Sequence, residues 1–171
     1  MTFNKPENFH NKLSFVFHGV LAAPLAWFVY LFLEIKHRQL KPLIHDELVI
    51  RIITIVVPVI AAVVLYLAYR YYKSQLAPIS KLHSLHDKLV AYYKLNLRLY
   101  IVTGIVSLLL VLSLYLTTAA VFTLGYVFLL FFMSLNRPDQ RKYVRDLRLS
   151  KQEAEVILKK GEFNDVEEVM Q

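Results

Sequence analysis

The sequence predicts an all-α, polytopic membrane protein with four transmembrane helices, a cytoplasmic amphipathic linker helix and a short helical C-terminal tail. The first observation is the stretch Leu99–Leu135, which holds no charged side chain. One helix of that length would reach ~55 Å, nearly twice a hydrocarbon core of ~30 Å, so the stretch has to fold back as two short spans. The second observation is a pair of apolar runs, Leu13–Leu33 and Ile50–Tyr69, each long enough to cross a bilayer.

The predicted elements divide the chain into a transmembrane domain, residues 1–136, and a cytoplasmic tail, residues 137–171. With 57% hydrophobic residues, the chain is too apolar for an ordinary soluble domain of its size. The expected bounds are about 13–33, 50–69, 99–116 and 119–135 for the four spans and about 79–98 for the linker helix.

The linker helix is predicted from an apolar stripe that follows Pro78. Leucine and tyrosine side chains recur there at three- and four-residue spacing, opposite a polar face. Pro78 in the first turn or Ser80 as the N-cap would begin the helix. Nothing between Leu89 and Leu99 breaks a helix, so we expect the linker helix to continue into the third span. The stripe consists of Leu82, Leu85, Leu89 and Tyr92 or Tyr93.

Two further boundaries are expected after the third span. A turn near Thr117–Thr118–Ala119 would make the third and fourth spans antiparallel neighbours. The fourth span would stop at Asn136–Arg137–Pro138, where a short tail helix begins. Ser150 and Glu153 match the S-x-x-E capping box of a second tail helix, which Gly161 would close.

Positive charge is distributed unevenly along the chain. The net charge is +7, and most of the 20 Lys and Arg residues fall in the segments that share a side of the membrane with both termini. Because cytoplasmic segments are enriched in Lys and Arg, both termini are predicted to lie in the cytoplasm. The chain has no cysteine, which excludes disulfides, thiolate metal sites and palmitoylation.

His18 is the one ionisable residue predicted inside a span and away from its ends. An ionisable group within the membrane is a functional hypothesis by default, so a proton relay or a ligand contact is one interpretation. The preferred interpretation is a structural tie: a neutral imidazole that faces the bundle interior and hydrogen-bonds to Thr103 or Tyr66 at a similar depth. No predicted span carries a carboxylate that would partner a relay.

Proline and small residues predict how the first two spans bend and pack. Pro24 and Pro58 lie near the middle of these spans, and each removes a backbone hydrogen bond, so we expect static kinks. Gly19 and Ala23 form a small-xxx-small pair on the first span, and Thr103 and Ser107 form one on the third. Both pairs favour close packing inside the bundle, with a dimer face as the second interpretation.

The sequence predicts no cofactor, no metal site and no catalytic residue. His83, His86 and Asp87 lie within one helical turn, but a metal site needs three or four ligands, and a solvated polar face is the preferred interpretation. Phosphate-loop, serine-hydrolase and zinc-protease motifs are absent. The tail looks like the start of a helix-turn-helix but is acidic where DNA would bind, so nucleic acid is not expected as a partner.

The tail begins with basic side chains that would face anionic lipid headgroups. Each basic residue near an anionic leaflet contributes ~1 kcal/mol, so Pro138–Leu149 is expected to lie along the membrane. The acidic helix that follows should project away from it. There Val156, Ile157 and Leu158 would contact a protein partner or the linker helix. The expected anionic-lipid contacts are Arg137, Arg141, Lys142, Arg145 and Arg148.

Two stretches carry a resemblance to a known family. Residues 84–93 read SLHDKLVAYY and residues 136–149 read NRPDQRKYVRDLRL. Together they resemble small bacterial four-span integral membrane proteins of unassigned function, whose linker reads S-L-x-x-K-L-x-x-Y and whose last span ends in N-R-P before K-x-x-x-D-L-x-L. The resemblance implies four spans and a multi-pass protein of the bacterial cytoplasmic (inner) membrane, and it brings no activity with it. The matching residues are Lys88, Tyr92, Asn136, Arg137, Pro138, Lys142, Asp146, Leu147 and Leu149.

Three functions are compatible with these observations. The main hypothesis is a non-enzymatic inner-membrane accessory or scaffold protein that docks a protein partner, or a second copy of itself, through its cytoplasmic helices. The alternative is a small transporter or channel that uses the region of Pro24, Pro58 and His18, for which a continuous polar lining would be needed. The third hypothesis is a membrane-embedded enzyme, for which no motif nominates a site.

The predicted topology can be tested with single cysteines in this cysteine-free chain. Gln39 lies in the expected outer connection and Ser84 in the expected cytoplasmic linker. We expect an impermeant thiol reagent applied outside intact cells to label Gln39→Cys and to spare Ser84→Cys until the membrane is permeabilised. Labelling of Ser84→Cys alone would reverse the topology.

Overall fold

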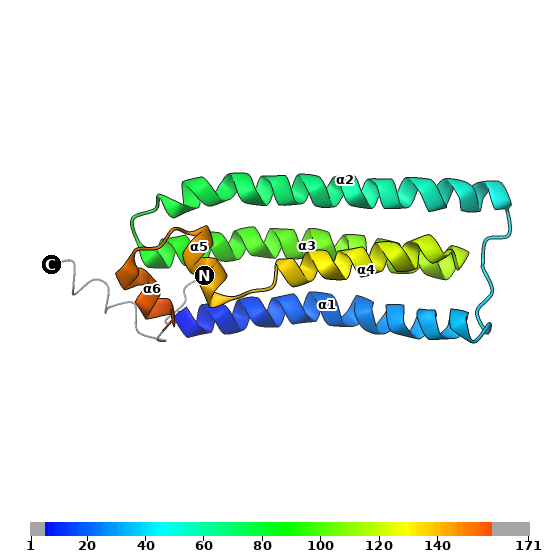
Figure 1. Ribbon diagram of the computed structural model, residues 1–171, viewed down its shortest axis with the longest axis horizontal. Helices are drawn as coiled ribbons and strands as arrows, with labels where there is room; N and C mark the ends of the chain where they lie inside the picture. The colour runs from blue at the N-terminus through cyan, green and yellow to red at the C-terminus, as the bar shows by residue number, and fades with distance from the viewer. Residues whose placement is uncertain (1–5, 159–171) are drawn as a thin grey trace. The chain divides into compact units, whose positions relative to one another are not determined.

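The computed structural model describes residues 6–158, and every helix or strand assigned in that range is an α-helix. The all-α prediction is therefore confirmed for the described chain. The helices, in chain order (Figure 1), are α1 (Pro6–Lys36), α2 (Glu47–Ser80), α3 (Leu85–Thr117), α4 (Ala120–Leu135), α5 (Gln140–Asp146) and α6 (Lys151–Leu158).

Three of the described helices, α1, α2 and α3, are long and apolar enough to cross a membrane. α4 has 16 residues and reaches about 24 Å at ~1.5 Å per residue. It counts toward a fourth span only together with α5, from which it is separated by a bend of 76°. The described chain therefore has three candidate spans, or up to four, and the span expected at 119–135 stays a prediction.

α2 carries apolar side chains around its whole circumference. Ile52, Val59 and Val63 are each at least half exposed, and very little of the apolar part of the helix is buried. Exposing this much apolar surface to water is unfavourable by ~25 cal/mol per Å². A helix that is apolar all round suits a hydrocarbon solvent, which agrees with the predicted second span.

The chain divides into two compact units. Among the described residues, the span unit comprises 18–68 and 100–136, and the tail unit comprises 6–17, 69–99 and 137–158. α1, α2 and α3 each contribute residues to both units, whereas α4 belongs to the span unit and α5 and α6 to the tail unit.

The core of the span unit is an aromatic stack between α1 and α4. Phe28 stacks on Tyr126 with ring centroids 4.1 Å apart, and Ser107 of α3 donates a hydrogen bond to the Tyr126 hydroxyl at 3.3 Å. Such aromatic pairs contribute about 0.5–1.5 kcal/mol beyond the burial of their area. Other buried members of this core are Leu31, Ala61, Val106, Leu110, Val111, Leu114, Phe122 and Leu129.

Close packing between α1 and α3 depends on Gly104 rather than on Gly19. A Cβ added at Gly104 would lie 2.9 Å from Cγ1 of Val20, whereas one added at Gly19 would meet nothing within 4 Å. Gly19 and Ala23 are both exposed. The expectation that Gly19 and Ala23 pack inside the bundle is therefore wrong, because the small residue at the close approach is supplied by α3.

The turn between α3 and α4 lies at Thr117–Thr118–Ala119, as the sequence predicts. Thr118 has a φ of 51°, which is rare for a β-branched residue. Its amide donates to the carbonyl of Leu114 at 2.8 Å, and the Thr117 hydroxyl accepts from the Ala119 amide at 3.3 Å. These bonds satisfy backbone groups at the helix end that a glycine motif would otherwise serve.

The structure corrects the start of the linker helix. Pro78 and Ser80 lie in the last turn of α2, where the Ser80 hydroxyl donates to the carbonyl of Ala77 at 2.8 Å. Residues 81–84 are not helical, and α3 then runs without interruption from Leu85 to Thr117. The apolar run of α2 thus extends the helix through Pro78, and residues 85–98 form the first part of α3 instead of a helix that begins near 79.

Gly104→Ala should destabilise the span unit, because Val20 is β-branched and has little room to move away from the new methyl group. We expect the free energy of unfolding in mild detergent to fall by about 1–3 kcal/mol. Gly19→Ala is the matched control and should leave stability unchanged or slightly raised, since alanine favours a helix over glycine. Equal stabilities of Gly104→Ala and the parent protein would contradict this packing.

Candidate functional site

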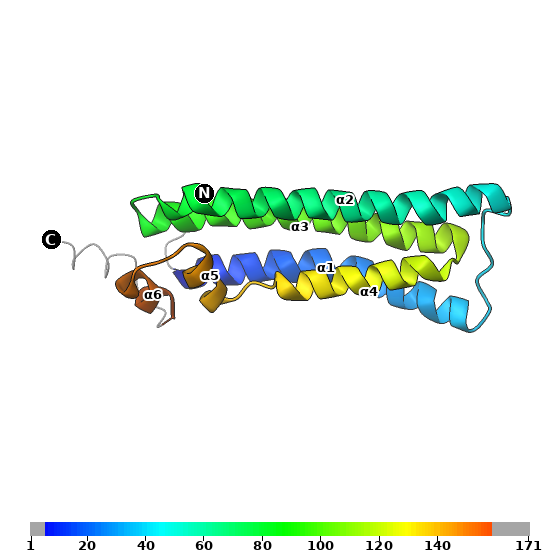
Figure 2. The same ribbon diagram turned by 45° about the horizontal axis from the view of Figure 1, so that its top comes forward.

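The candidate site lies in the tail unit, where α5 joins the ends of two long helices. Tyr72 comes from the last turns of α2, Tyr92 from the first turns of α3, and Asp146 from the end of α5. We call these three residues the tyrosine–aspartate cluster. Figure 2 shows α5 beside the first turns of α1.

The Asp146 carboxylate is the centre of the cluster. The hydroxyls of Tyr72 and Tyr92 each donate to Oδ2 of Asp146 at 3.1 Å, and the Tyr72 hydroxyl also lies 3.0 Å from that of Tyr92. The Asp146 side chain is only 4% exposed, and Nε of the exposed Arg145 approaches Oδ1 at 3.7 Å. A buried carboxylate is tolerated when hydrogen bonds replace its water, and two hydroxyl donors on one oxygen do so here.

Tyr143 extends the cluster toward α1. Its ring packs edge-on against Phe9, with centroids 5.2 Å apart, and against Tyr92 at 5.6 Å. Its hydroxyl lies 3.0 Å from Nδ1 of His10, with the donor set by the imidazole tautomer. Tyr143 therefore connects α5 to α1 as Asp146 connects it to α2 and α3.

A buried ion pair holds α6 against α3. Nζ of Lys88 donates to Oε1 of Glu153 at 2.7 Å, and both side chains are 10% exposed. Oε2 of the same carboxylate accepts from the Ser150 amide at 2.8 Å, while the Glu153 amide donates to the Ser150 hydroxyl at 3.2 Å. The predicted capping box is thus confirmed, and Gly161, its expected end, lies outside the described residues.

The hydrogen bonds of Glu153 favour its charged form. Burial alone would raise the pKa of this carboxyl, but the hydrogen bond from Lys88 and those from Ser150 outweigh burial and lower the pKa below its ordinary value. A depressed folded-state pKa adds stability that is present at neutral pH and is lost as the pH falls through that pKa. The contact between α6 and α3 should therefore weaken only in acid.

The five basic residues expected to contact anionic lipid do not share one environment. Arg137, Arg141, Arg145 and Arg148 are exposed, whereas Lys142 is partly buried. Nζ of Lys142 lies 5.7 Å from the centroid of the Tyr72 ring. Burial lowers the pKa of Lys142 to about 8, with Lys73 and Arg145 lowering it and Asp146 raising it. Lipid contact by the four arginines stays a prediction.

The structure does not enclose His18 as the sequence suggested. His18 and Tyr66 are exposed, Tyr66 at 62%, whereas Thr103 is buried at 1%. The expectation that His18 faces the bundle interior is therefore wrong, and its hydrogen bond to Thr103 or Tyr66 stays a prediction. An apolar helix offers no polar face that would mark its inner side, and the other helices of the span unit decide which side is covered.

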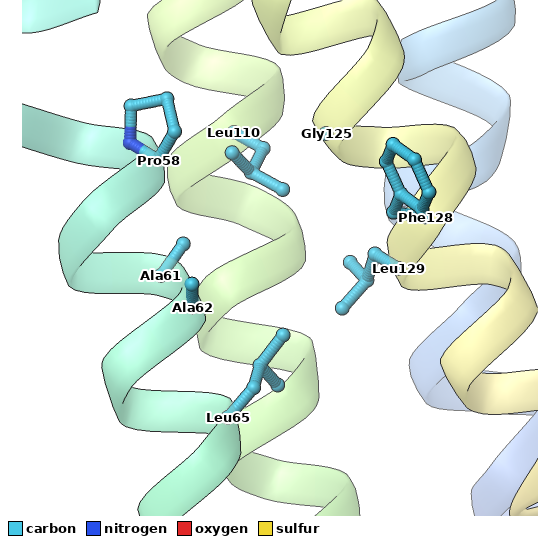
Figure 3. Close-up of a pocket in the computed structure, with 8 residues that line it drawn as sticks. All are labelled: Pro58, Ala61, Ala62, Leu65, Leu110, Gly125, Phe128 and Leu129. Atoms are coloured by element: carbon cyan, nitrogen blue, oxygen red, sulfur yellow. The ribbon is translucent and has the colours of Figure 1, made fainter. Parts of the chain in front are cut away.

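An apolar pocket of about 300 Å³ lies in the span unit beside Pro58. Figure 3 shows α2 and α4 on its two sides and Leu110 of α3 between them. Pro24, by contrast, is buried on α1. The pocket gives the transporter or channel hypothesis no polar lining at this place. The lining residues are Pro58, Ala61, Ala62, Leu65, Leu110, Gly125, Phe128 and Leu129.

Within residues 6–158 no group of three or more His, Cys, Asp or Glu side chains is arranged to hold a metal ion. His83 is exposed, and Nδ1 of His86 lies 3.6 Å from the exposed carboxylate of Asp87. The contacts described in the tail unit position and connect helices.

No protein-family model, curated protein or solved structure matches this chain. The resemblance to small bacterial four-span proteins therefore stays a prediction. The structure does bring its two stretches together, because Tyr92 of the first donates to Asp146 of the second.

Sequence reasoning missed most of the contacts that organise the tail unit. No sequence pattern marks Tyr72 as a contact residue, and Lys88 enters the sequence analysis only through its match to the resembled family. The available signal for Lys88 was its position one residue before the buried stripe residue Leu89. Val156 and Ile157 are buried within the chain, whereas Leu158 is exposed. Two contacts were expected for this helix, a protein partner or the linker, and the ion pair between Glu153 and Lys88 provides the contact with the linker.

Lys88→Met should release α6, because it leaves Glu153 buried without its partner. Leaving a buried charge without its partner costs about 3–5 kcal/mol. An eight-residue helix is too unstable by itself to offset that cost. We expect faster amide hydrogen exchange across residues 151–158, measured by mass spectrometry. Adding Glu153→Gln should restore much of the protection, since glutamine keeps the capping box without the charge. Lys94→Met, at an exposed lysine of the same helix, is the control; equal exchange in both single variants would contradict the ion pair's role.

Proposed function

We propose that this protein is a non-enzymatic membrane accessory or scaffold protein that docks a protein partner through its tail unit. The observation that supports the proposal most directly is the tyrosine–aspartate cluster, in which two hydrogen bonds to Asp146 fix α5 to α2 and to α3. An ordered surface is better suited to specific docking than a loose tail, because less entropy is lost on binding.

The outer face of α6 is the surface that we assign to the partner. Lys151, Gln152 and Leu158 are exposed on this helix, while Val156 and Ile157 on its other side are buried in the tail unit. An exposed leucine among polar side chains is the kind of apolar centre with a polar rim that interfaces use. The excess of Lys and Arg in the segments that carry this face supports a cytoplasmic location for it.

The apolar helices support a membrane anchor for this surface. α2 buries little of its apolar length within the chain, and the pocket beside Pro58 is lined by apolar side chains. An accessory protein requires of its spans only that they insert and pack. A transporter would require a polar route through them.

Asp146→Asn is the variant that tests the proposal. The amide keeps the shape of the side chain but loses the charge that strengthens the hydrogen bonds from the two tyrosines, so α5 should loosen by about 1.5–3 kcal/mol. Asp87→Asn, at an exposed carboxylate of the same unit, is the matched control. We expect a stoichiometric partner to copurify with the parent protein and the control in mild detergent, and to be lost from Asp146→Asn.

Hydrogen exchange of residues 140–158 shows whether Asp146→Asn has loosened the tail unit in that experiment. Partner retention by a variant with a loosened tail unit would refute docking through this unit. A monodisperse parent protein without any partner would favour the transporter or channel alternative.

A further inference from the structure

We propose that the apolar pocket beside Pro58 binds one acyl chain of a phospholipid whose headgroup carries both a phosphate and a primary amine. The phosphate contacts Arg51 and the amine contacts Glu47, both in the first turns of α2. The site lies entirely in the span unit, so it is independent of the partner docking that the proposed function places on α6.

The pocket is an apolar space between two helices that a hydrocarbon chain can fill. It has a volume of about 300 Å³, and Ala61, Ala62 and Gly125 leave it open because they carry little or no side chain. Leu65 of α2 and Leu129 of α4 line its two sides (Figure 3). That volume is at the small end of the ~300–1,000 Å³ typical of ligand pockets, so it suits a single chain and not a whole lipid.

Arg51 and the pocket share one face of α2. Pro58 follows Arg51 by seven residues, and Leu65 follows Pro58 by seven, a spacing that places side chains on the same side of an α-helix. At ~1.5 Å per residue, the helix rises about 21 Å from Arg51 to Leu65. One leaflet with its headgroups is ~20–22 Å thick, so a phosphate at Arg51 places the acyl chain beside residues 58–65.

Two charged side chains lie at the start of this face, and neither is paired. Glu47 lies one turn before Arg51, and both are exposed. Within residues 6–158 neither forms an ion pair, although opposite charges four residues apart on a helix are placed to do so. Asp46, the neighbouring carboxylate, already accepts from two backbone amides of the first turn.

A phospholipid with an ethanolamine headgroup matches the order of these charges. Its phosphate lies nearer to the acyl chains and its ammonium lies farther out, as Glu47 lies farther from the pocket than Arg51. The guanidinium can donate two parallel hydrogen bonds to the phosphate, and the ammonium can donate to the carboxylate. A headgroup without the amine would leave the charge of its phosphate beside Glu47 without compensation.

The depth of Arg51 agrees with this placement. A long basic side chain near the end of a membrane helix extends toward the interface, which brings its guanidinium to the level of the headgroups. The acyl chain then meets only the apolar lining of the pocket.

Photo-cross-linking of the full-length protein in phosphatidylcholine nanodiscs measures occupancy of the pocket. The probe is a trace of phosphatidylethanolamine with a diazirine in the middle of one acyl chain, and mass spectrometry locates the cross-links. We expect cross-links to concentrate at residues 58–65 and 125–129, and unlabelled phosphatidylethanolamine to compete more strongly than phosphatidylglycerol. Even labelling around the circumference of α2 would mean bulk lipid only and would overturn the proposal.

Two substitutions close the pocket from opposite sides. Ala62→Phe fills it from α2 and Gly125→Leu from α4, where an added Cβ meets Leu110 at an ordinary contact distance of 3.5 Å. Both should abolish the concentrated labelling. Val63→Phe, at an exposed position of α2 that does not line the pocket, is the matched control and should keep it. Equal labelling of Ala62→Phe and Val63→Phe would contradict binding in the pocket.

Glu47→Gln and Arg51→Gln separate the two headgroup contacts. Glu47→Gln should remove the preference for phosphatidylethanolamine over phosphatidylglycerol. Arg51→Gln should weaken competition by both lipids about fivefold, since one basic residue near a headgroup contributes ~1 kcal/mol. Lys41→Gln, at an exposed lysine before α2, is the control and should change neither. The headgroup assignment is overturned if the parent protein shows no preference for phosphatidylethanolamine, or if Lys41→Gln and Arg51→Gln weaken competition equally.

Discussion

The arrangement of helices in the tail unit is set by the Asp146 carboxylate, which loses its hydrating water when α5 packs. Removing a carboxylate from water costs several kcal/mol, and only well-placed donors make up for it. Here the donors are two tyrosine hydroxyls, one from α2 and one from α3, so α5 has a low free energy only where both helix ends are already present. Apolar burial stabilises the unit, while this carboxylate determines which arrangement of helices is acceptable.

The Lys88–Glu153 pair imposes the same kind of condition on α6. Replacing a buried ion pair by apolar side chains is often neutral for stability. The contribution of the Lys88–Glu153 pair is therefore to specify one position of α6 against α3. Glu153 also caps α6 through Ser150, which makes the folding of the helix and its contact with α3 depend on a single carboxylate. Because a helix as short as α6 is only marginally stable by itself, it becomes ordered when it packs against α3.

Local patterns in the sequence were sufficient for much of the fold. The charge-free stretch up to Leu135 predicted a turn, and the capping box at Ser150 predicted the start of α6, because each depends on neighbours along the chain. The orientation of His18 and the burial of Lys88 could not be read in this way. In a helix that is apolar all round, no periodicity distinguishes the inner from the outer side, so packing between distant segments decides. The candidate site is built from such packing, and only its residue types were visible beforehand.

The contacts of Tyr143 and Asp146 also have a consequence for the order of events during synthesis. Tyr143 meets His10 across 133 residues of chain, and Asp146 meets Tyr72 across 74. Contacts between segments this distant are slow to form, because the intervening loop must first be closed. Since domains assemble as the chain emerges, α1, α2 and α3 are in place before the residues that join them are made. Closure of the tail unit therefore comes after the three long helices have formed, and a nascent chain still short of Asp146 would lack the carboxylate that accepts from Tyr72 and Tyr92.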